Sequence, residues 1–195
     1  MKRIIILVTT LAATLAFTAC GNRSTGKNNQ TSEMAAMAVT QVDDLLARAE
    51  TLTGQKVTIE GVCTHICRHG GRKLFLMGSD NKKVIRVEAG DKIGSFGPEC
   101  VNNLVRVTGT LTEDRIDEAY LTQWEQRVKD QTAEKHDSDE AGCSTEKQAR
   151  GESAASGPEK RIAAFRARIA DRKAKEDKDY LSFYHVDGQS YEIIK

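Results

Sequence analysis

Hydrophobic and polar residues alternate along much of the chain between residues 55 and 128. A period of two places successive side chains on opposite faces of a strand, so this pattern predicts half-buried β-strands. Valine, isoleucine and threonine are frequent there, and turn residues separate the first three strands. A short apolar tract at 93–101 contains two glycines and a proline, and we expect a short helix or structured loop. The predicted strands cover residues 57–67, 73–78, 83–88, 104–112 and 119–125.

Helical periodicity replaces this alternation on both sides of the strands. Apolar residues recur at helical spacing over residues 35–54, which predicts an N-terminal helix with Gly54 as its C-cap. Residues 158–178 predict a second helix that begins at a proline and is otherwise rich in charge. Its narrow apolar stripe consists of Ile162, Phe165 and Ile169.

The remaining C-terminal segments differ sharply in composition. Residues 129–157 contain almost no large apolar side chains, which predicts a disordered linker. Residues 179–195 alternate around Asp187-Gly188, a dipeptide typical of two-residue turns, and therefore predict a β-hairpin. Because an isolated hairpin is marginal in water, we expect it to pack on the helix, on the strands or on a partner.

Five strands with a helical insert between the third and fourth are the layout of the OB-fold, a small Greek-key barrel. Gly61 lies in the long first strand, where a bend is needed. The tract Val105-Arg-Val-Thr-Gly-Thr-Leu111 is similar to the fourth strand of small bacterial OB-fold domains of the nucleic-acid-binding type, which include exported and lipoprotein versions. The resemblance covers residues 56–128. It implies a mainly β, α+β chain with an OB-fold barrel at 55–128, and it brings no catalytic signature.

The N-terminal residues carry a targeting signal. Residues 1–19 start with a basic pair, continue with an apolar tract and end in two small residues before Cys20. The apolar tract is shorter than the roughly 20 residues of a membrane-spanning helix. The segment resembles a bacterial lipoprotein signal peptide, although Phe17 stands where leucine is usual. The resemblance implies cleavage before Cys20, acylation of Cys20 and a flexible tether at 20–34; a secretory signal and an uncleaved anchor are the alternatives.

Lipidation would place the protein in the cell envelope. Gly21 follows the cysteine, whereas aspartate there would signal retention in the inner membrane, so the outer membrane is favoured. The expected partners are the membrane, through the lipid, and an envelope protein that the C-terminal helix and hairpin could dock.

Composition narrows the function classes. The 195 residues include 29 basic and 28 acidic side chains, a net charge of +1, and aromatic residues make up 5%. Nucleic-acid binding is therefore unlikely despite the fold, because such surfaces are usually basic and rich in stacking rings. The chain contains no nucleophile–base motif and no phosphate-binding loop, and we expect no enzymatic activity.

Potential metal ligands occupy every second position of one tract: Cys63, His65, Cys67 and His69. In an extended strand they would share one face. Cys63 and Cys67 would lie about 13 Å apart and could not form a disulfide. His65 and a neighbouring cysteine could share a metal, with a third ligand from His69 or Cys100. Zinc, copper or haem iron would suit these donors.

Apolar residues shift from odd-numbered to even-numbered positions as the chain enters this tract. Val57 and Ile59 alternate out of phase with Val62 and Ile66. A bulge at Gly61 would bring all four onto one buried face and leave the cysteines and histidines on the outer face.

Two other roles for these cysteines remain open. Buried cysteine often acts as a small apolar side chain. In an exported chain thiols also tend to pair, and Cys100 with Cys63 or Cys67 would be the natural disulfide.

A small basic loop follows the ligand tract. Arg68, Arg72 and Lys73 flank two glycines and could contact an anion in the ligand groove, although a solvated turn is the simpler interpretation.

The leading hypothesis is an envelope-anchored, non-enzymatic OB-fold binding or interaction module. Metal or haem handling by the Cys63–His69 tract is the alternative, and nucleic-acid binding is third.

Overall fold

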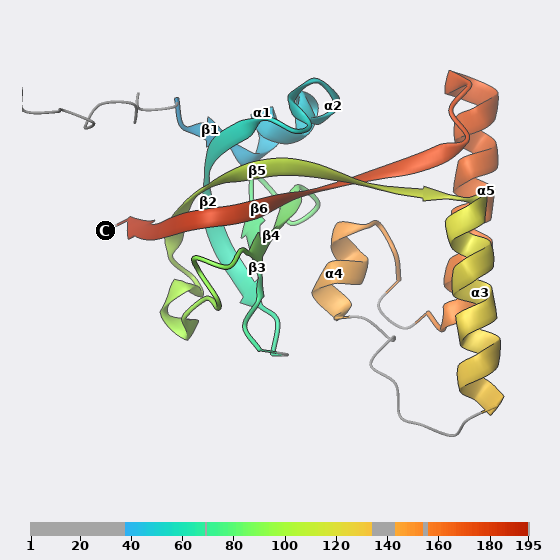
Figure 1. Ribbon diagram of the computed structural model, residues 1–195. Helices are drawn as coiled ribbons and strands as arrows, with labels where there is room; N and C mark the ends of the chain where they lie inside the picture. The colour runs from blue at the N-terminus through green and yellow to red at the C-terminus, as the bar shows by residue number, and fades with distance from the viewer. Residues whose placement is uncertain (1–37, 69, 134–142, 154–155, 195) are drawn as a thin grey trace, which may run out of the picture. The chain divides into compact units, whose positions relative to one another are not determined.

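The computed structural model describes residues 38–68, 70–133, 143–153 and 156–194 (Figure 1). The predicted signal peptide, Cys20 and the tether lie outside these ranges, as does His69. Within the described ranges, no helix is both long enough and apolar enough to cross a membrane.

The strands close into a barrel because alternate side chains of each strand point toward a common apolar interior. Neighbouring strands of the barrel pair antiparallel, except for the parallel pair β4 (Val84–Ala89) and β6 (Tyr180–Ile194). This arrangement is a five-stranded OB-fold barrel with flanking helices, so the predicted α+β fold class is confirmed. In barrel order the strands are β2 (Lys56–Ile66), β3 (Lys73–Met77), β4 (Val84–Ala89), β6 (Tyr180–Ile194) and β5 (Leu104–Asp117), which pairs back with β2.

Shorter elements complete the N-terminal half. The two-residue strand β1 (Thr40–Gln41) pairs parallel with β2. The helix predicted at 35–54 is shorter within the described residues and is divided into α1 (Val42–Ala47) and α2 (Ala49–Leu52). The apolar tract at 93–101 contains a single 3₁₀ turn, η1 (Pro98–Cys100).

The predicted fifth strand at 119–125 is wrong, because these residues belong to the helix α3 (Glu118–Ala133). Its buried residues Leu121, Trp124 and Val128 recur at spacings of three and four, which is the period of a helix. The Asp117 carboxylate also accepts a hydrogen bond from the Tyr120 backbone N–H at 2.8 Å and caps the first turn.

The predicted hairpin at 179–195 is also wrong. Residues 180–194 form one continuous strand, β6, which supplies the fifth barrel strand. Asp187-Gly188 lies in mid-strand, where a Cβ on its partner Gly109 would approach the Asp187 carbonyl oxygen to 2.3 Å. The glycine pair therefore serves the close approach of β5 and β6, beside a bulge in which Gln189 is the extra residue.

The linker predicted at 129–157 contains helical structure. α3 continues to Ala133, and a short helix α4 (Ser144–Ala149) follows. α5 then runs from Pro158 to Glu176. Within the tract, residues 134–142 and 154–155 lie outside the described ranges.

Two groups of buried apolar residues result. β5 and β6 extend beyond the barrel and pack their far ends on α3 and α5 (Figure 1). The barrel core lies between the strands and α1 and includes Ile59, Leu76, Ile85, Val107 and Leu111. The second group, called the helical cluster below, comprises Ile116, Leu121, Trp124, Val128, Ile162, Phe165, Ile169 and Leu181.

Candidate functional site

The cysteine at the start of the ligand tract faces the barrel interior, opposite to the prediction. Cys63 is fully buried in the barrel core, whereas Val62 is 37% exposed. Ile59, Gly61 and Cys63 alternate onto the same inward face of β2. The bulge lies at Thr64, after Cys63, and not at Gly61 as predicted. Gly61 has another role: a Cβ there would lie 2.9 Å from the Met77 carbonyl oxygen and 3.0 Å from Val42 of α1.

Cys63, His65 and Cys67 do not bring their donor atoms into one three-ligand group within the described residues. Cys63, Cys67 and Cys100 are buried thiols, and Cys63 and Cys100 share the barrel core. Burial raises the pKa of the Cys63 thiol to about 11 and also raises the pKa of Cys100. The Cys100 disulfide stays a prediction.

His65 instead meets a cysteine from the predicted linker. The Cys143 Sγ lies 3.2 Å from His65 Nε2, just before α4. The His65 ring also packs at 5.7 Å from the Phe75 ring. Burial, together with the charge of Arg68, lowers the pKa of His65. These contacts help to hold α4 against the barrel.

The basic loop after the tract is engaged with the protein itself. The Lys73 ammonium forms an ion pair with Glu146 of α4 at 3.1 Å. Arg72 donates a hydrogen bond to the Ala89 carbonyl at 3.4 Å. Two of the three cations proposed for an anion groove therefore brace β3, β4 and α4.

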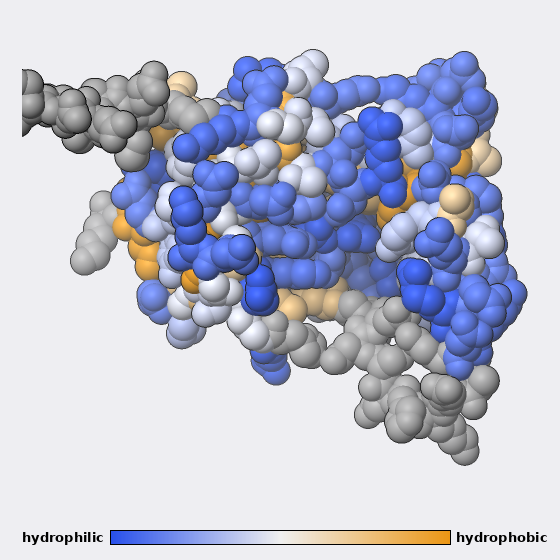
Figure 2. Space-filling view, in the orientation of Figure 1, coloured by the Kyte–Doolittle hydropathy of each residue, from blue (hydrophilic) through white to orange (hydrophobic). Residues whose placement is uncertain are grey.

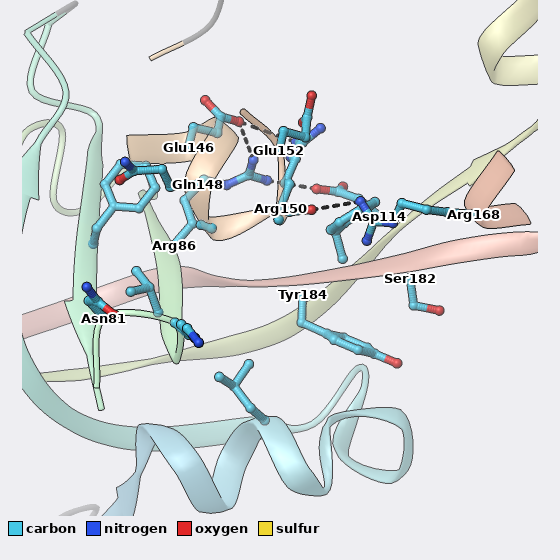
Figure 3. A pocket seen from close by; sticks show the side chains of 17 residues that line it. Asn81, Arg86, Asp114, Glu146, Gln148, Arg150, Glu152, Arg168, Ser182 and Tyr184 are labelled. Atoms are coloured by element: carbon cyan, nitrogen blue, oxygen red, sulfur yellow. Dashed lines mark hydrogen bonds and ion pairs between the residues drawn. The ribbon is translucent and has the colours of Figure 1, made fainter. Parts of the chain in front are cut away.

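A cavity of about 710 Å³ opens where α4, α5 and the outer face of the barrel meet (Figure 3). Phe75, Val84 and Arg86 contribute from β3 and β4. Phe75 is fully buried, although its neighbours Leu74 and Leu76 point into the barrel core. The other lining residues are Leu46, Asn81, Lys82, Asp114, Glu146, Gln148, Ala149, Arg150, Gly151, Glu152, Arg168, Ser182, Phe183 and Tyr184.

Arg86 is the centre of the charges on the barrel side of the cavity. Its guanidinium is 2.7 Å from a carboxylate oxygen of both Asp114 and Glu146, and its Nε is 3.1 Å from Glu88. The pKa of Asp114 is lowered to about 2. The neighbouring His185 ring makes the largest contribution, and the Arg86 guanidinium makes a smaller one. Burial disfavours ionised Glu146, but Lys73, Arg86 and Arg150 lower its pKa overall. Glu146 thus ties α4 to β3 and β4.

His185 of β6 is 6% exposed and stands between two carboxylates. Its Nδ1 is 3.3 Å from Asp114 and its Nε2 is 3.2 Å from Asp187. Burial opposes protonation, but Asp114 raises the pKa of the ring overall. Donor atoms of Glu88, His185 and Asp187 all lie within 4.8 Å of one another, the one such three-ligand group in the described part of the chain.

Two arginines face the aromatic side of the cavity. The guanidiniums of Arg150 and Arg168 lie 5.4 and 5.5 Å from the Phe183 ring centroid, and Arg168 also lies 5.5 Å from Phe165. Desolvation by nearby protein atoms lowers the pKa of Arg168. Among the described residues, no carboxylate forms an ion pair with Arg168, whereas Arg150 pairs with Glu146 at 3.3 Å.

The sequence prediction missed this group because it placed Glu146 and Arg150 in a linker and His185 and Asp187 in a hairpin, apart from Arg86, Glu88 and Asp114. The available signal was the polar alternation at positions 86 and 88, 112 and 114, and 185 and 187. The three pairs become neighbours only through the β4–β6 and β5–β6 registers.

Comparison with known proteins adds little to this geometry. No family model and no curated protein matches the chain. Among solved structures, a chain described as "putative aspartyl-tRNA synthetase from Leishmania major Friedlin" is similar over 46% of this chain and 18% of its own length, with 16% identity and a TM-score of 0.27. A likeness this partial carries no argument about function, so the OB-fold assignment rests on strand order and register.

Proposed function

We propose that the protein is a lipid-anchored, non-enzymatic binding module of the bacterial envelope that holds a small anionic ligand in the cavity beside α4. The observation that carries the proposal is the cavity of about 710 Å³ with Arg168 exposed on its wall and without a carboxylate partner among the described residues. Cavities of roughly 300–1,000 Å³ are typical of sites for small organic ligands.

The cavity wall suits a ligand with an anionic group on a ring or an apolar body. Phe183 supplies aromatic surface, and the planar guanidinium of Arg168 lies 5.5 Å from its ring centroid. Arg86 is already paired with Asp114 and Glu146, so it shapes the wall rather than attracting the ligand. Arg168 is therefore the expected anion contact.

The proposed location at the envelope membrane is supported by the sequence alone. A lipid on Cys20 would hold the barrel at the membrane through the polar segment 20–34. Substitution Cys20→Ala should release the protein from the membrane fraction, whereas Cys143→Ala should leave it there. Equal fractionation of the two variants would contradict the anchor.

Ligand binding is tested by calorimetry on the full-length chain in detergent. The probes are digalacturonate and inorganic pyrophosphate as anions, with cellobiose as the neutral control. Charge-assisted hydrogen bonds contribute about 1.5–3 kcal/mol, so Arg168→Gln should weaken binding of an anionic probe by about tenfold or more.

The matched control is Arg48→Gln, which removes an exposed arginine that does not line the cavity. It should bind like the wild type. Failure of both anions to bind, or an equal loss in both variants, would refute the proposed site.

A further inference from the structure

Three potential metal ligands meet on the outer face of β4 and β6. Glu88 and Asp187 are direct neighbours in the parallel β4–β6 register, and His185 pairs with Arg86 two residues earlier. One donor atom from each of Glu88, His185 and Asp187 lies within 4.8 Å of the others. Because all three side chains stand on paired strands, their backbone positions are held by the sheet.

The closest pair of donors already has the spacing of two ligands on one ion. His185 Nε2 and Asp187 Oδ1 are 3.2 Å apart. Two ligands at roughly 2.0–2.1 Å from a tetrahedral zinc ion lie about 3.4 Å apart. Glu88 then needs only a side-chain adjustment to complete a three-ligand set, and 38% exposure of its side chain allows this.

The two carboxylates of the set are also held from behind by other residues. The Asp187 Oδ2 accepts a hydrogen bond from the Thr112 hydroxyl at 2.6 Å, which leaves Oδ1 toward the histidine. Glu88 Oε1 lies 3.1 Å from Arg86 Nε, which leaves its second oxygen for an ion. Such supporting contacts orient the ligands of metal sites.

The buried ring of His185 supplies a second, independent indication. It is 6% exposed, and its Nδ1 makes no hydrogen bond, although Asp114 lies only 3.3 Å away. Coordination through Nε2 would fix the proton on Nδ1 and turn it toward Asp114, so the unsatisfied atom would gain its partner.

The local charge matches a divalent cation. Glu88, Asp114 and Asp187 lie around the ring, and Arg86, which pairs with Glu88 and Asp114, is the one guanidinium paired with these carboxylates among the described residues. Three carboxylates against one guanidinium leave a charge of −2 when the imidazole is neutral. A bound divalent ion would neutralise it.

We propose that Glu88, His185 and Asp187 form a zinc-binding site on the outer face of the barrel. One imidazole with two carboxylates is a donor set that zinc accepts, and three protein ligands leave a fourth position for water or another small ligand. This site is separate from the Cys63–His69 tract and needs none of its donors.

The test is titration of the full-length chain, purified without a histidine tag, with ZnCl₂ against a chromophoric chelator. We expect one zinc ion per chain. Asp187→Asn and Glu88→Gln are partly exposed substitutions that should leave the fold intact, and each should weaken binding by about tenfold or more, since even supporting residues are worth about 10–100-fold.

The His65→Ala variant is the matched control, because it removes a histidine of the other candidate metal tract. It should bind zinc like the wild type. Loss of binding in His65→Ala with retention in Asp187→Asn would overturn the assignment, as would the absence of one-to-one binding in the wild type.

A spectroscopic readout separates the two donor sets independently of affinity. Co²⁺ bound in place of zinc at Glu88, His185 and Asp187 should show ligand-field bands without a thiolate-to-cobalt charge-transfer band. A thiolate band that survives Asp187→Asn would assign the ion to cysteine and refute the proposal.

Discussion

The barrel core and the helical cluster are built on different principles, although β5 and β6 run through both. The barrel core is mostly aliphatic, and the backbone hydrogen bonds of its strands close into a ring. The helical cluster has fewer buried residues and relies on Trp124 and Phe165. Arginines cover these rings from outside, with Arg161 4.7 Å from the Trp124 centroid and Arg168 5.5 Å from that of Phe165.

This difference shows how a small barrel can carry a large insertion. Because the strands close into a ring, their backbone N–H and C=O groups bond to one another, and the barrel core needs no covering layer of charged side chains. The helices have only one narrow apolar stripe, so their packing requires the extended arms of β5 and β6 on one side and long arginine stems on the other. The helical cluster should therefore open locally, whereas the barrel should open only as a whole.

Removing the central ring of the helical cluster should have the largest effect. Phe165 is fully buried between Trp124 and Phe183, with ring centroids 6.3 and 5.8 Å away. Phe165→Ala should cost about 3–5 kcal/mol, felt mainly as faster hydrogen exchange in α3 and α5. Leu111→Ala in the barrel core should instead lower protection in all strands together. Parallel loss across the whole molecule in Phe165→Ala would show that the two regions form one cooperative unit.

A methyl group at the junction should come next. Gly109 approaches β6 so closely that a Cβ would meet the Asp187 oxygen at 2.3 Å and Val186 at 2.7 Å. Gly109→Ala should destabilise the protein by about 1–3 kcal/mol, because the two strands must separate. Urea unfolding measures this, with Ser190→Ala on the exposed side of β6 as the control. An unchanged midpoint in Gly109→Ala would mean that the arms are not rigidly paired.

Arg161→Lys tests whether the arginine cover matters through its shape or its charge. Arg161 is 9% exposed and pairs with Glu152, and its planar guanidinium also lies over Trp124. Lysine keeps the charge but loses the stacked, forked geometry, so we expect a loss of about 1–2 kcal/mol. Arg166→Lys, at a more exposed ion pair with Glu118 and Glu125, should change stability by less than about 0.5 kcal/mol. Equal changes in stability in the two variants would show that Arg161 acts through its positive charge alone.

The smallest expected effect concerns a carboxylate on the barrel side. Asp43 of α1 accepts hydrogen bonds from Lys83, at 2.6 Å, and from the Ser79 hydroxyl and backbone N–H; these contacts lower the pKa of Asp43. A carboxyl with a lowered folded-state pKa stabilises above its ordinary pKa, and the stabilisation disappears as pH falls below about 4. Asp43→Asn should therefore lower the urea midpoint at pH 7, with the difference shrinking in acid. The control is Asp44→Asn, at an exposed neighbour that makes none of these contacts, and an equal loss at pH 7 in both variants would contradict the role of Asp43.

The alternation of apolar and polar residues correctly predicted the strands whose positions can be recognised from their own sequence. β2, β3, β4 and the first part of β5 lie within one or two residues of the predicted strands. The fifth barrel strand could not be found in this way, because β6 pairs with segments far away in the chain. Asp187-Gly188 favours a turn locally, but partners on both sides hold it extended. Residues 119–125 alternate briefly, and only their buried positions reveal the helix.

The candidate site was less predictable for the same reason. The tract from Cys63 to His69 predicts a metal site because its ligand types recur at every second position, yet the strand turns Cys63 into the core. Arg86, Asp114, Glu146 and His185 come from four separate segments and acquire a shared chemistry only after β6 has joined the sheet. The polar alternation around Arg86, Asp114 and His185 indicates an outer strand face, but it does not show which of these residues become partners.

The position of β6 after the helical insertion also has a consequence for folding. Arg86 and His185 are direct partners in the parallel β4–β6 register, although they lie about a hundred residues apart in the chain. β2 to β5 are synthesised well before this partner exists, and the barrel cannot close until residues 180–194 have been made. Pairings over such separations carry a large loop-closure cost, so the barrel should fold slowly and late. An incomplete chain would thereby keep its sheet edges on β4 and β5 open until β6 has been synthesised.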